Sequence, residues 1–561
     1  MKKIPIGYSD FKRIRSTAEL LYVDKTDLIS EFVEDQCMVL LITRPRRFGK
    51  TLNLSTLRYF FDQENALENR KLFDGLKVSQ NKKTMALQGS RPVINLSFKD
   101  CKTQNWHNMQ SMIHGLFAKT SEAFQSYFEQ GTDPSQRALR AIFQKNASYD
   151  ESCNFLFHLS FLCQKNTNLS PLILIDEYDV PLQSAWAYNY WDEAITFFRN
   201  FFSAAFKDNP YLWRGVITGC LRVARESMFT GMNNLEVSSV SSKSYSKHFG
   251  FTIPEVKQLI QDYNLGAIEA KIESWYNGYR FGETTIYNPW SILNLLKNEG
   301  EFRPYWINTS GNDLVKEILS RSGVNAKKDL EDLMTGKTIT VPLQEQVVFQ
   351  EIENSPANLW NFLYFTGYLK AVSTKETDES LLVELKIPNK EVKRIFSDSI
   401  QLWFQHSESS SLIPNLKSAL MLGDVTEISK ALRKLCDTSL SYFDATGKEP
   451  EKFYHGLVLG LMTYFSDTWH IRSNRESGLG RCDLLMTPKN RDHYGIVMEF
   501  KTMDSYEDSD LVACAQNAMT QIEKRQYEQE LMSQGATKIL KMGIGFLGKK
   551  LEILCQINQG T

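Results

Sequence analysis

An apolar run at residues 38–43 leads directly into Arg44-Pro-Arg-Arg-Phe-Gly-Lys-Thr51, and a segment with helical periodicity follows over 51–61. A strand that turns into a helix N-terminus leaves several backbone N–H groups without partners inside the helix. Together with the Lys50 amine and the Thr51 hydroxyl, such groups hold phosphate oxygens and a magnesium ion in phosphate-binding loops. The pattern therefore predicts a strand, a phosphate-binding loop and a helix, in this order.

Further apolar runs rich in β-branched residues lie at 92–96, 172–175 and 213–218. Continuous apolar runs are typical of strands that are covered on both faces, as in a parallel sheet. Segments with helical periodicity, such as 191–206, lie between the runs. Alternating strands and helices predict an α/β domain with helices on both faces of a parallel sheet.

Polar residues end two of these runs. Leu172-Ile-Leu-Ile-Asp-Glu177 ends in two carboxylates, and Thr218 ends the run at 213–218. Ligands of open α/β sheets bind at the carboxyl ends of the strands. We expect Asp176 to share a magnesium ion with Thr51, Glu177 to orient or deprotonate an attacking water, and Thr218 to sense the γ-phosphate.

Two arginines near this edge each allow two interpretations. Arg44 occupies the position where phosphate-binding loops usually have glycine, so the loop either bends differently or carries an extra charge where the triphosphate lies. Arg222 follows the last strand closely and could neutralise transition-state charge, but most arginines are solvated on the surface. Both interpretations of Arg222 stay open on the sequence alone.

The chain of 561 residues is longer than a single domain, and the pattern of apolar, aromatic and charged residues changes along it. We expect a phosphate-binding α/β domain at 1–238, a mostly helical, aromatic-rich lid region at 239–375, connecting helices at 376–447 and a second α/β domain at 448–561. No apolar run approaches the roughly 18 residues that span a bilayer, and the N-terminal lysines are not followed by the apolar h-region of a signal peptide. A cytoplasmic protein without a membrane partner is expected.

The second α/β region places an acid and an amine on one strand. In Glu499-Phe-Lys501, alternation puts Glu499 and Lys501 on one face and Phe500 on the other. If this strand pairs with the strand that contains Asp483, then Asp483, Glu499 and the Phe500 carbonyl can hold Mg²⁺ or Mn²⁺. Lys501 would then position or activate the water that attacks phosphorus.

Several segments resemble a known bacterial family: Arg44-Pro-Arg-Arg-Phe-Gly-Lys-Thr51, Leu174-Ile-Asp-Glu-Tyr-Asp179, Phe229-Thr-Gly-Met-Asn-Asn234, Trp275-Tyr-Asn-Gly-Tyr279 and Tyr287-Asn-Pro-Trp-Ser291. They are similar to AAA-ATPase-like proteins fused to a PD-(D/E)XK nuclease domain. The resemblance runs through essentially the whole chain, and in that family the loop also reads R-P-R-R-F-G-K. It implies an AAA-like core, a helical lid that carries the tryptophan-rich motifs, and a C-terminal nuclease-like domain.

The resemblance also adds residues to both sites. In the nucleotide site the expected binding residues are Arg44, Arg47, Gly49, Lys50, Thr51, Asp176 and Thr218. In the nuclease domain, where Cys482 replaces the usual proline before Asp483, the resemblance implies that His455 completes the metal shell and that Glu476 assists. Gln521 and Tyr527 resemble a Q-I-x-x-x-x-Y signature and would lie near nucleic acid. The aromatic motifs of the lid could stack bases, but packing in the lid core is the commoner role of such residues.

Together these expectations describe a nucleotide-regulated nuclease, in which one chain is both an ATPase and a Mg²⁺-dependent hydrolase. Its ligands would be ATP, Mg²⁺ or Mn²⁺, and DNA or RNA; further copies of the chain are an open alternative as partners. With a net charge of −1, a nucleic-acid surface must be local. A rival of another class is a signalling or scaffold switch whose C-terminal domain binds nucleic acid or protein without cleaving it. A role in defence against foreign DNA would be a context for the same chemistry.

Overall fold

The computed structural model describes two compact units. One unit comprises Met1–Ser310 and Thr340–Glu391, and the other comprises Gly311–Ile339 and Val392–Thr561. The residues described within them are 1–222, 228–229, 231–306, 329–330, 332–334, 336–345, 356–378, 380–396, 412–440, 458, 461–462, 464–477, 480–503, 510–547 and 550–559. Within these ranges, no helix is both long enough and apolar enough to cross a bilayer.

A five-stranded parallel sheet forms the centre of the first unit, in the order β2-β3-β4-β1-β5. Its strands are β1 (Val39–Thr43), β2 (Val93–Ser97), β3 (Leu172–Asp176), β4 (Arg214–Gly219) and β5 (Leu235–Ser238). Every residue of β1, β3 and β4 is buried, which is why these strands read as continuous apolar runs. The predicted parallel α/β domain is confirmed. The edge strand β5 is not among the predicted strands, because four residues, of which only the last is buried, leave little signal.

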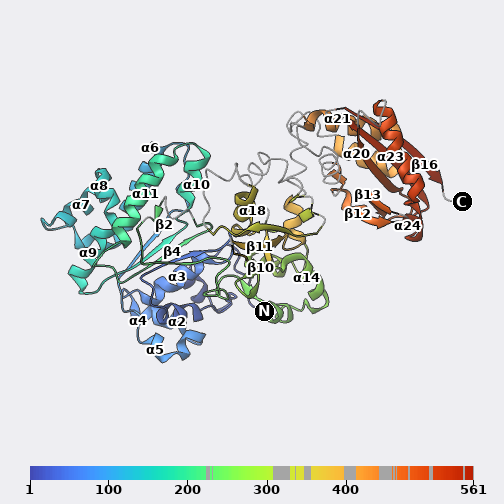
Figure 1. The fold of residues 1–561 in the computed structure, drawn as a ribbon. Coiled ribbons are helices and arrows are strands. Elements are labelled where there is room, and N and C mark those ends of the chain that lie inside the picture. The colour runs from blue at the N-terminus through green and yellow to red at the C-terminus, as the bar shows by residue number, and fades with distance from the viewer. Residues whose placement is uncertain are drawn as a thin grey trace. The chain divides into compact units, whose positions relative to one another are not determined.

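Helices cover both faces of this sheet, with α6 and α11 on one side and α2, α3 and α4 on the other (Figure 1). Phenylalanine rings fill the layer under α6 and α11; Phe117 stacks on Phe155 at 4.3 Å and on Phe201 at 5.2 Å. The helices of this part are α1 (Phe11–Arg15), α2 (Asp27–Glu34), α3 (Lys50–Phe61), α4 (Ala66–Arg70), α5 (Lys82–Met85), α6 (Trp106–Ser121), α7 (Pro134–Phe143), α8 (Tyr149–Cys153), α9 (Phe155–Thr167), α10 (Val180–Ala187) and α11 (Trp191–Phe206).

The middle of the chain contains two small three-stranded sheets, so the prediction of a mostly helical region is wrong in part. The first has the order β6-β8-β7 and the second β10-β11-β9. Their strands are β6 (Phe251–Thr252), β7 (Tyr279–Phe281), β8 (Thr284–Tyr287), β9 (Ile339–Pro342), β10 (Lys370–Glu376) and β11 (Leu381–Lys386). The strands β6 to β9 have only two to four residues each, too few to show a period of two. Strands β10 and β11 have seven and six residues, and the prediction missed them. Helices α13 (Ile253–Asp262), α14 (Glu269–Tyr276), α15 (Pro289–Lys297) and α18 (Pro356–Phe365) accompany them.

Most of the aromatic motifs in this region form its core, as predicted. Tyr276 and Trp360 are completely buried, and Tyr279 and Trp306 are nearly so. The rings of Trp306 and Tyr368 lie 4.9 Å apart. The packing extends to the phosphate-binding loop, because Phe48 contacts Tyr279 at 5.0 Å and the Trp306 indole N–H donates to the Arg46 carbonyl at 3.3 Å.

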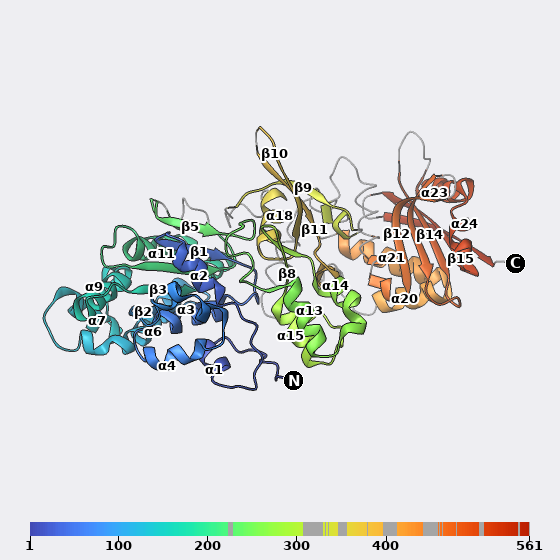
Figure 2. The same ribbon diagram turned by 90° about the horizontal axis from the view of Figure 1, so that it is seen from below.

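In the second unit, a mixed five-stranded sheet has the order β12-β13-β14-β15-β16. Its strands are β12 (Trp469–Ser477), β13 (Gly480–Pro488), β14 (Gly495–Thr502), β15 (Lys538–Leu547) and β16 (Lys550–Gln559), drawn side by side in Figure 2. Strands β14 and β15 are parallel and are joined through α23 (Leu511–Arg525) and α24 (Glu528–Ser533), whereas the other pairs are antiparallel. Two helices, α20 (Leu412–Leu422) and α21 (Val425–Leu440), precede the sheet.

Candidate functional sites

The phosphate-binding loop lies between β1 and α3. Gly49 caps α3 with a φ of 85°, a left-handed conformation that favours glycine. The Lys50 side chain is 6% exposed and bends back over the loop, where its amine donates to the carbonyls of Arg44 at 2.8 Å and Pro45 at 3.0 Å. In this structure the lysine thus satisfies carbonyls of its own loop, and an incoming phosphate would have to replace those contacts.

Three elements converge on the Asp176 carboxylate at the end of β3. Thr51, in the first turn of α3, donates to Asp176 Oδ2 at 2.6 Å, and Thr218, on β4, donates to Asp176 Oδ1 at 2.5 Å. Both contacts follow from the fold, because β4 lies between β3 and β1. The structure brings these three predicted residues together. A carboxylate beside a hydroxyl is a donor set that suits a hard ion such as Mg²⁺.

Glu177 follows Asp176 in a left-handed conformation, with a φ of 53°. This turn separates its side chain from that of Asp176, and Glu177 lines a cavity beside the loop. Burial raises the pKa of the Glu177 carboxyl, and the nearby Lys50 amine opposes that rise. A carboxylate with an increased proton affinity is suited to accept a proton from water.

The structure places Arg44 differently from the sequence-based expectation of an extra charge at the triphosphate. Its guanidinium is completely buried and donates to the carbonyls of Thr43 and Ser238, each at 2.8 Å. It lies over the rings of Phe249 at 5.4 Å and Phe281 at 5.2 Å. Burial lowers the pKa of Arg44 to about 9. Arg44 therefore fixes the start of the loop to the end of β5, because carbonyls and aromatic faces replace its lost hydration.

The cavity beside the loop has a volume of about 590 Å³. Its lining includes Arg46, Arg47 and Lys50 together with Tyr8 and Trp290. The Arg47 guanidinium lies 4.3 Å from the centre of the Trp290 ring. Sequence reasoning missed Arg46, because nothing in the local sequence separates it from its neighbours. It also missed the N-terminal segment around Tyr8, which no motif marks.

Arg222 pairs with Glu345, its Nη1 lying 3.3 Å from Glu345 Oε2. The second carboxylate oxygen of Glu345 accepts from the Ser241 hydroxyl at 2.6 Å. The pair ties the segment after β4 to the segment after β9. A role in charge neutralisation would require Arg222 to leave this partner, so the arrangement favours the structural interpretation of Arg222.

A second constellation lies on the hairpin of β13 and β14. These strands pair antiparallel with Leu484 opposite Met498, so Asp483 and Glu499 are the next residues along the two strands. The Asp483 backbone N–H donates to Glu499 Oε2 at 3.4 Å, and the Phe500 N–H donates to Asp483 Oδ2 at 2.9 Å. The predicted hairpin is confirmed, and it brings the two carboxylates side by side.

Helix α23 completes this constellation with an amide. Glu499 is only 2% exposed, and its Oε1 accepts a hydrogen bond from Gln521 Nε2. Tyr527 is completely buried behind them, in a cluster with Val497 and Ile522. Burial raises the pKa of Tyr527, and a hydrogen bond with Gln521 opposes that rise. Gln521 is therefore at the site as the resemblance implied, whereas Tyr527 supports it from the core and is not exposed to a nucleic acid.

Two glycines on β15 bring α23 close to the sheet. Gly543 is in register with Glu499, and Gly545 with Lys501. A Cβ atom at Gly543 would lie 2.6 Å from the Ala515 carbonyl oxygen, and one at Gly545 would lie 2.9 Å from the Ala515 nitrogen. The missing side chains thus allow the backbone of α23 to approach the strand, which sets the distance between Gln521 and Glu499. The alternating glycines of Gly543-Ile-Gly545 were a signal for this that the sequence reasoning did not use.

The remaining predicted residues differ in how far the structure describes them. Lys501 is partly buried on the same face of β14 as Glu499, and Phe500 is completely buried on the other face. Glu476 lies on β12 opposite Arg481, but its side chain is outside the described residues. His455 is outside the described residues altogether. The described part of the site therefore offers Asp483, Glu499 and the Phe500 carbonyl as oxygen ligands for a hard ion.

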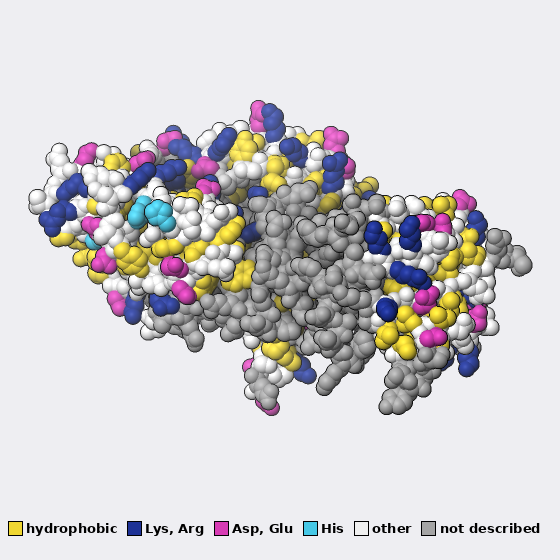
Figure 3. All heavy atoms as spheres, turned by 90° about the horizontal axis from the view of Figure 1, so that it is seen from above, with side chains coloured by type: hydrophobic (Ala, Val, Ile, Leu, Met, Phe, Trp, Pro, Cys, Tyr) yellow, Lys and Arg dark blue, Asp and Glu magenta, His cyan; other side chains and the backbone are white. Residues whose placement is uncertain are grey.

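Figure 3 shows lysine and arginine side chains interspersed with acidic ones over the described part of one face. This agrees with the net charge of −1. Contacts with nucleic-acid phosphates would have to come from local basic residues.

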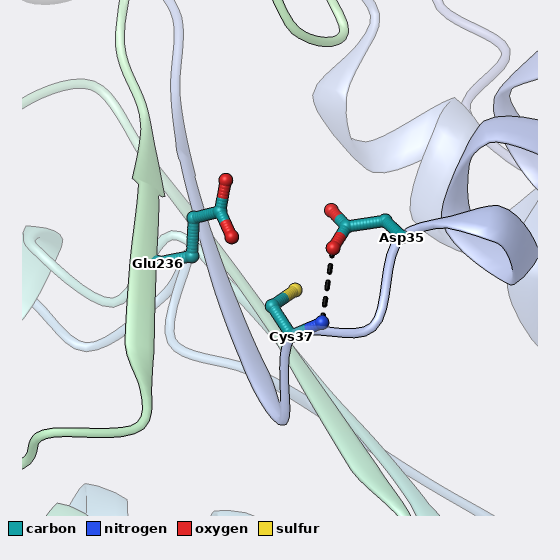
Figure 4. A group of neighbouring side chains, drawn as sticks. All are labelled: Asp35, Cys37 and Glu236. Atoms are coloured by element: carbon teal, nitrogen blue, oxygen red, sulfur yellow. Dashed lines mark hydrogen bonds between the residues drawn. The ribbon is translucent and has the colours of Figure 1, made fainter.

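Asp35, Cys37 and Glu236 form another group with possible metal ligands, all within 4.8 Å of one another (Figure 4). Asp35 is already engaged, since it accepts from the Tyr245 hydroxyl at 2.6 Å and from the Cys37 N–H at 2.9 Å. The Cys37 sulfur accepts from Arg214 at 3.3 Å, and burial raises the pKa of its thiol to about 11. A protonated thiol beside a cation disfavours metal binding. We assign no metal to this group.

Comparisons with known proteins match the two domains in which these constellations lie. Residues 5–229, which contain the phosphate-binding loop and β1 to β4, match the family described as predicted AAA-ATPase. Residues 449–555, which contain Asp483, Glu499 and Lys501, match the PD-(D/E)XK nuclease superfamily. The chain joins an AAA-ATPase-like domain to a PD-(D/E)XK nuclease superfamily domain. An uncharacterized protein of the vnfD 5′ region of Azotobacter chroococcum mcd 1 is 28% identical to it over 412 residues, 72% of this chain and 70% of that protein.

Proposed function

We propose that the AAA-ATPase-like domain binds and hydrolyses ATP, and that the PD-(D/E)XK domain uses a divalent ion to cleave phosphodiester bonds in DNA or RNA. We further propose that nucleotide binding regulates cleavage. The observation that carries the proposal is that Asp483, Glu499 and Gln521 lie next to one another, and that Lys501 lies on the same strand as Glu499. A purely structural hairpin has no need for two carboxylates side by side at the edge of its core.

For the nucleotide half, the support is the agreement between chemistry and position. Lys50, Thr51, Asp176 and Thr218 meet where β1, β3 and β4 end, and Glu177 lines the adjoining cavity. Thr51 and Asp176 would hold Mg²⁺, which neutralises phosphate charge when bound. Lys50 would exchange its loop carbonyls for phosphate oxygens, and Glu177 would take a proton from the attacking water.

For the nuclease half, the oxygen ligands of Asp483, Glu499 and Phe500 fit Mg²⁺ or Mn²⁺ better than a softer metal. When bound, the ion would polarise the phosphate and stabilise the charge that develops on it. Gln521 fixes the orientation of the Glu499 carboxylate through a hydrogen bond. Lys501, on the same face of β14, would hold the attacking water against phosphorus.

The nuclease half is tested by metal-dependent cleavage of single- and double-stranded DNA and RNA. We expect Asp483→Ala and Lys501→Ala to reduce cleavage by the Mg²⁺-loaded or Mn²⁺-loaded protein at least about 100-fold, the scale expected when a charge-stabilising group is lost. Equal cleavage by the wild type and both variants would remove the assignment. A wild type that binds nucleic acid without cutting it would instead favour the signalling or scaffold switch.

The nucleotide half is tested by ATP titration and by phosphate release. We expect Lys50→Ala to weaken ATP binding, and Glu177→Gln to keep binding but lose hydrolysis. The second substitution preserves size while it removes the base. ATP affinity that is unchanged in Lys50→Ala would contradict the proposed phosphate site.

A further inference from the structure

The loop that joins β2 to α6 presents two lysines to the cavity beside the phosphate-binding loop. Lys99 and Lys102 line this cavity, as do Lys50 and Glu177. Both lysine side chains of the β2–α6 loop are exposed. Among the residues that the structure describes, neither amine has a hydrogen bond or an ion pair, and Asp100, between them, pairs with neither. They differ in this from Lys50, whose amine is already bonded to two loop carbonyls.

The position of the β2–α6 loop follows from the sheet. Strand β2 pairs with β3 in parallel, with Ser97 in register with Asp176. The pairing extends one bond further, since the Phe98 N–H donates to the Asp176 carbonyl at 3.0 Å. Lys99 comes directly after Phe98, and Glu177 comes directly after Asp176. Lys99 and Glu177 therefore leave the sheet from neighbouring strands at the same edge, where ligands of open α/β sheets bind.

The backbone of this loop is anchored at both ends. Phe98 and Cys101 are buried, with exposed fractions of 0% and 3%. At the other end, the Thr103 N–H donates to the Ser184 hydroxyl at 3.0 Å, and this hydroxyl donates to the Thr103 carbonyl at 2.8 Å. The Tyr190 hydroxyl donates to the same carbonyl at 2.8 Å. The loop is thus fixed to α10, the helix that follows β3, and only its exposed side chains can turn freely.

We propose that Lys99 and Lys102 bind the γ-phosphate of ATP and supply positive charge for its hydrolysis. The inference rests on the proposed nucleotide site and deepens it. In hydrolysis, the oxygen of water bonds to the γ-phosphorus, the bond from that phosphorus to the β–γ bridging oxygen breaks, and ADP leaves with the electron pair. Glu177 takes the proton that the water releases. Negative charge develops on the oxygens around the γ-phosphorus during this transfer, so cations beside Glu177 lower the barrier.

Other basic residues at this edge are less suited to that role. Arg222, which the sequence offered for charge neutralisation, is paired with a carboxylate, and Arg44 is buried against carbonyls. Lys99 and Lys102 instead carry their amines on flexible four-carbon stems. These stems can turn toward a ligand without breaking a contact in the described part of the chain. The lysine pair can therefore supply the charge that Arg222 is not placed to give.

The test compares ATP hydrolysis and the affinities for ATP and ADP, with Mg²⁺, in the full-length protein. The double variant Lys99→Met/Lys102→Met removes both charges and keeps the length of the side chains. We expect its kcat to fall at least about 100-fold and its ATP affinity to fall about 10-fold, the scale of lost charge-assisted contacts. Its ADP affinity should equal that of the wild type, because ADP lacks the γ-phosphate. Lys99→Arg/Lys102→Arg keeps both charges and should retain most of the activity.

The matched control is Lys82→Met/Lys83→Met, which removes two exposed lysine charges from α5, outside the lining of the cavity. This control should hydrolyse ATP as the wild type does. Equal losses of kcat in the control and in Lys99→Met/Lys102→Met would show an effect of net charge and overturn the inference. Thermal unfolding is recorded for every variant, so that a loss of fold is separated from a loss of contact.

Wild-type kcat and ATP affinity in Lys99→Met/Lys102→Met would also overturn the inference. So would equal losses of ATP and ADP affinity, because the lysines would then not act on the γ-phosphate. A variant that hydrolyses ATP normally but binds a single-stranded oligonucleotide more weakly would overturn it in favour of a nucleic-acid contact.

A failure of the nucleotide site is recognised separately. If Lys50→Ala and the wild type bind ATP equally, or the wild type does not bind or hydrolyse ATP, the proposed nucleotide function itself fails. That result differs from a failure of the lysine pair alone, in which Lys50→Ala weakens ATP binding but Lys99→Met/Lys102→Met does not.

Discussion

The two sites assemble their polar groups over very different distances along the chain. In the nucleotide domain, the residues that meet at Asp176 are 125 and 42 positions away from it. In the nuclease domain, the hydrogen bonds that join Asp483, Glu499, Phe500 and Gln521 span 16 to 22 positions. Parallel strands need long crossover connections, whereas a hairpin brings neighbouring segments together directly. The first site therefore depends on a whole sheet, and the second on one hairpin and one helix.

The largest expected effect is on the nuclease site, whose residues lie close together in the sequence. Asp483→Asn keeps the size of the side chain but removes its charge, so metal-dependent cleavage should fall at least about 100-fold while the fold is retained. Cleavage rate and circular dichroism together check this. Asp510→Asn is the matched control, because Asp510 caps α23 and asparagine is an equally good N-cap. A similar loss of cleavage in both variants would show that the effect is not specific to the hairpin.

The next effect concerns the hydroxyl that reaches Asp176 from α3. Thr51→Val is nearly isosteric and removes this hydroxyl, so Mg²⁺-dependent ATP affinity should fall roughly 10-fold, as expected for the loss of one charge-assisted hydrogen bond and one ion ligand. Thr56→Val, one turn later in the same helix, removes a hydroxyl that bonds to the Leu52 carbonyl. If titration shows that both variants lose the same ATP affinity, the loss comes from any hydroxyl removed from this helix and is not specific to Thr51.

A smaller effect tests the close approach of α23 to β15. Gly543→Ala forces a Cβ atom against the backbone of Ala515 and Met519, so the nuclease domain should lose about 1–3 kcal/mol of unfolding free energy. Gly115→Ala, in α6, meets nothing within 4 Å and should stabilise its domain by about 0.5–1 kcal/mol. Denaturant unfolding measures both. If the unfolding free energy changes in the same direction for both substitutions, the packing argument is contradicted.

The last prediction lies outside both sites and is a pH dependence of stability in the first unit. Glu391 is completely buried and accepts from the Trp306 N–H and the Ser291 hydroxyl, and burial raises its pKa from 4.5 to about 7. A carboxyl with a raised pKa stabilises the fold most below pH 4.5, and this contribution is lost as the pH rises through 7. Relative to Glu391→Gln, the unfolding free energy of the wild type should therefore fall by roughly 3 kcal/mol between pH 4.5 and 7.5. A constant difference across this range would contradict the assignment.

The sequence predicted most of both sites because their chemistry lies in short strands with strong patterns. Asp176, Thr218 and Thr51 could be placed together since the ends of parallel strands share an edge. Asp483 and Glu499 could be placed together since alternation and one hairpin suffice. Arg44 could not be placed, because neither spacing nor residue type shows that the carbonyl of Ser238 and two aromatic rings surround it.

Contacts between distant segments account for the other differences. Arg46 lines the cavity and donates to Gln183, which lies 137 positions away in the sequence. The strands β6 to β9 are too short to show a period of two, whereas β10 and β11 are long enough and the helical prediction for them is wrong. Domain boundaries at 238, 375 and 447 remain predictions, since the compact units are built from two segments each.

Counting bound Mn²⁺ in the full-length protein tests the central claim most directly, namely that one chain carries two separate ion sites. Without nucleotide, we predict tight binding that is lost in Asp483→Asn and kept in Asp176→Asn. With ATP, we predict additional binding that is lost in Asp176→Asn and kept in Asp483→Asn. If Asp483→Asn leaves the nucleotide-free binding intact, or ATP adds no ion to the wild type, the two-site account is contradicted.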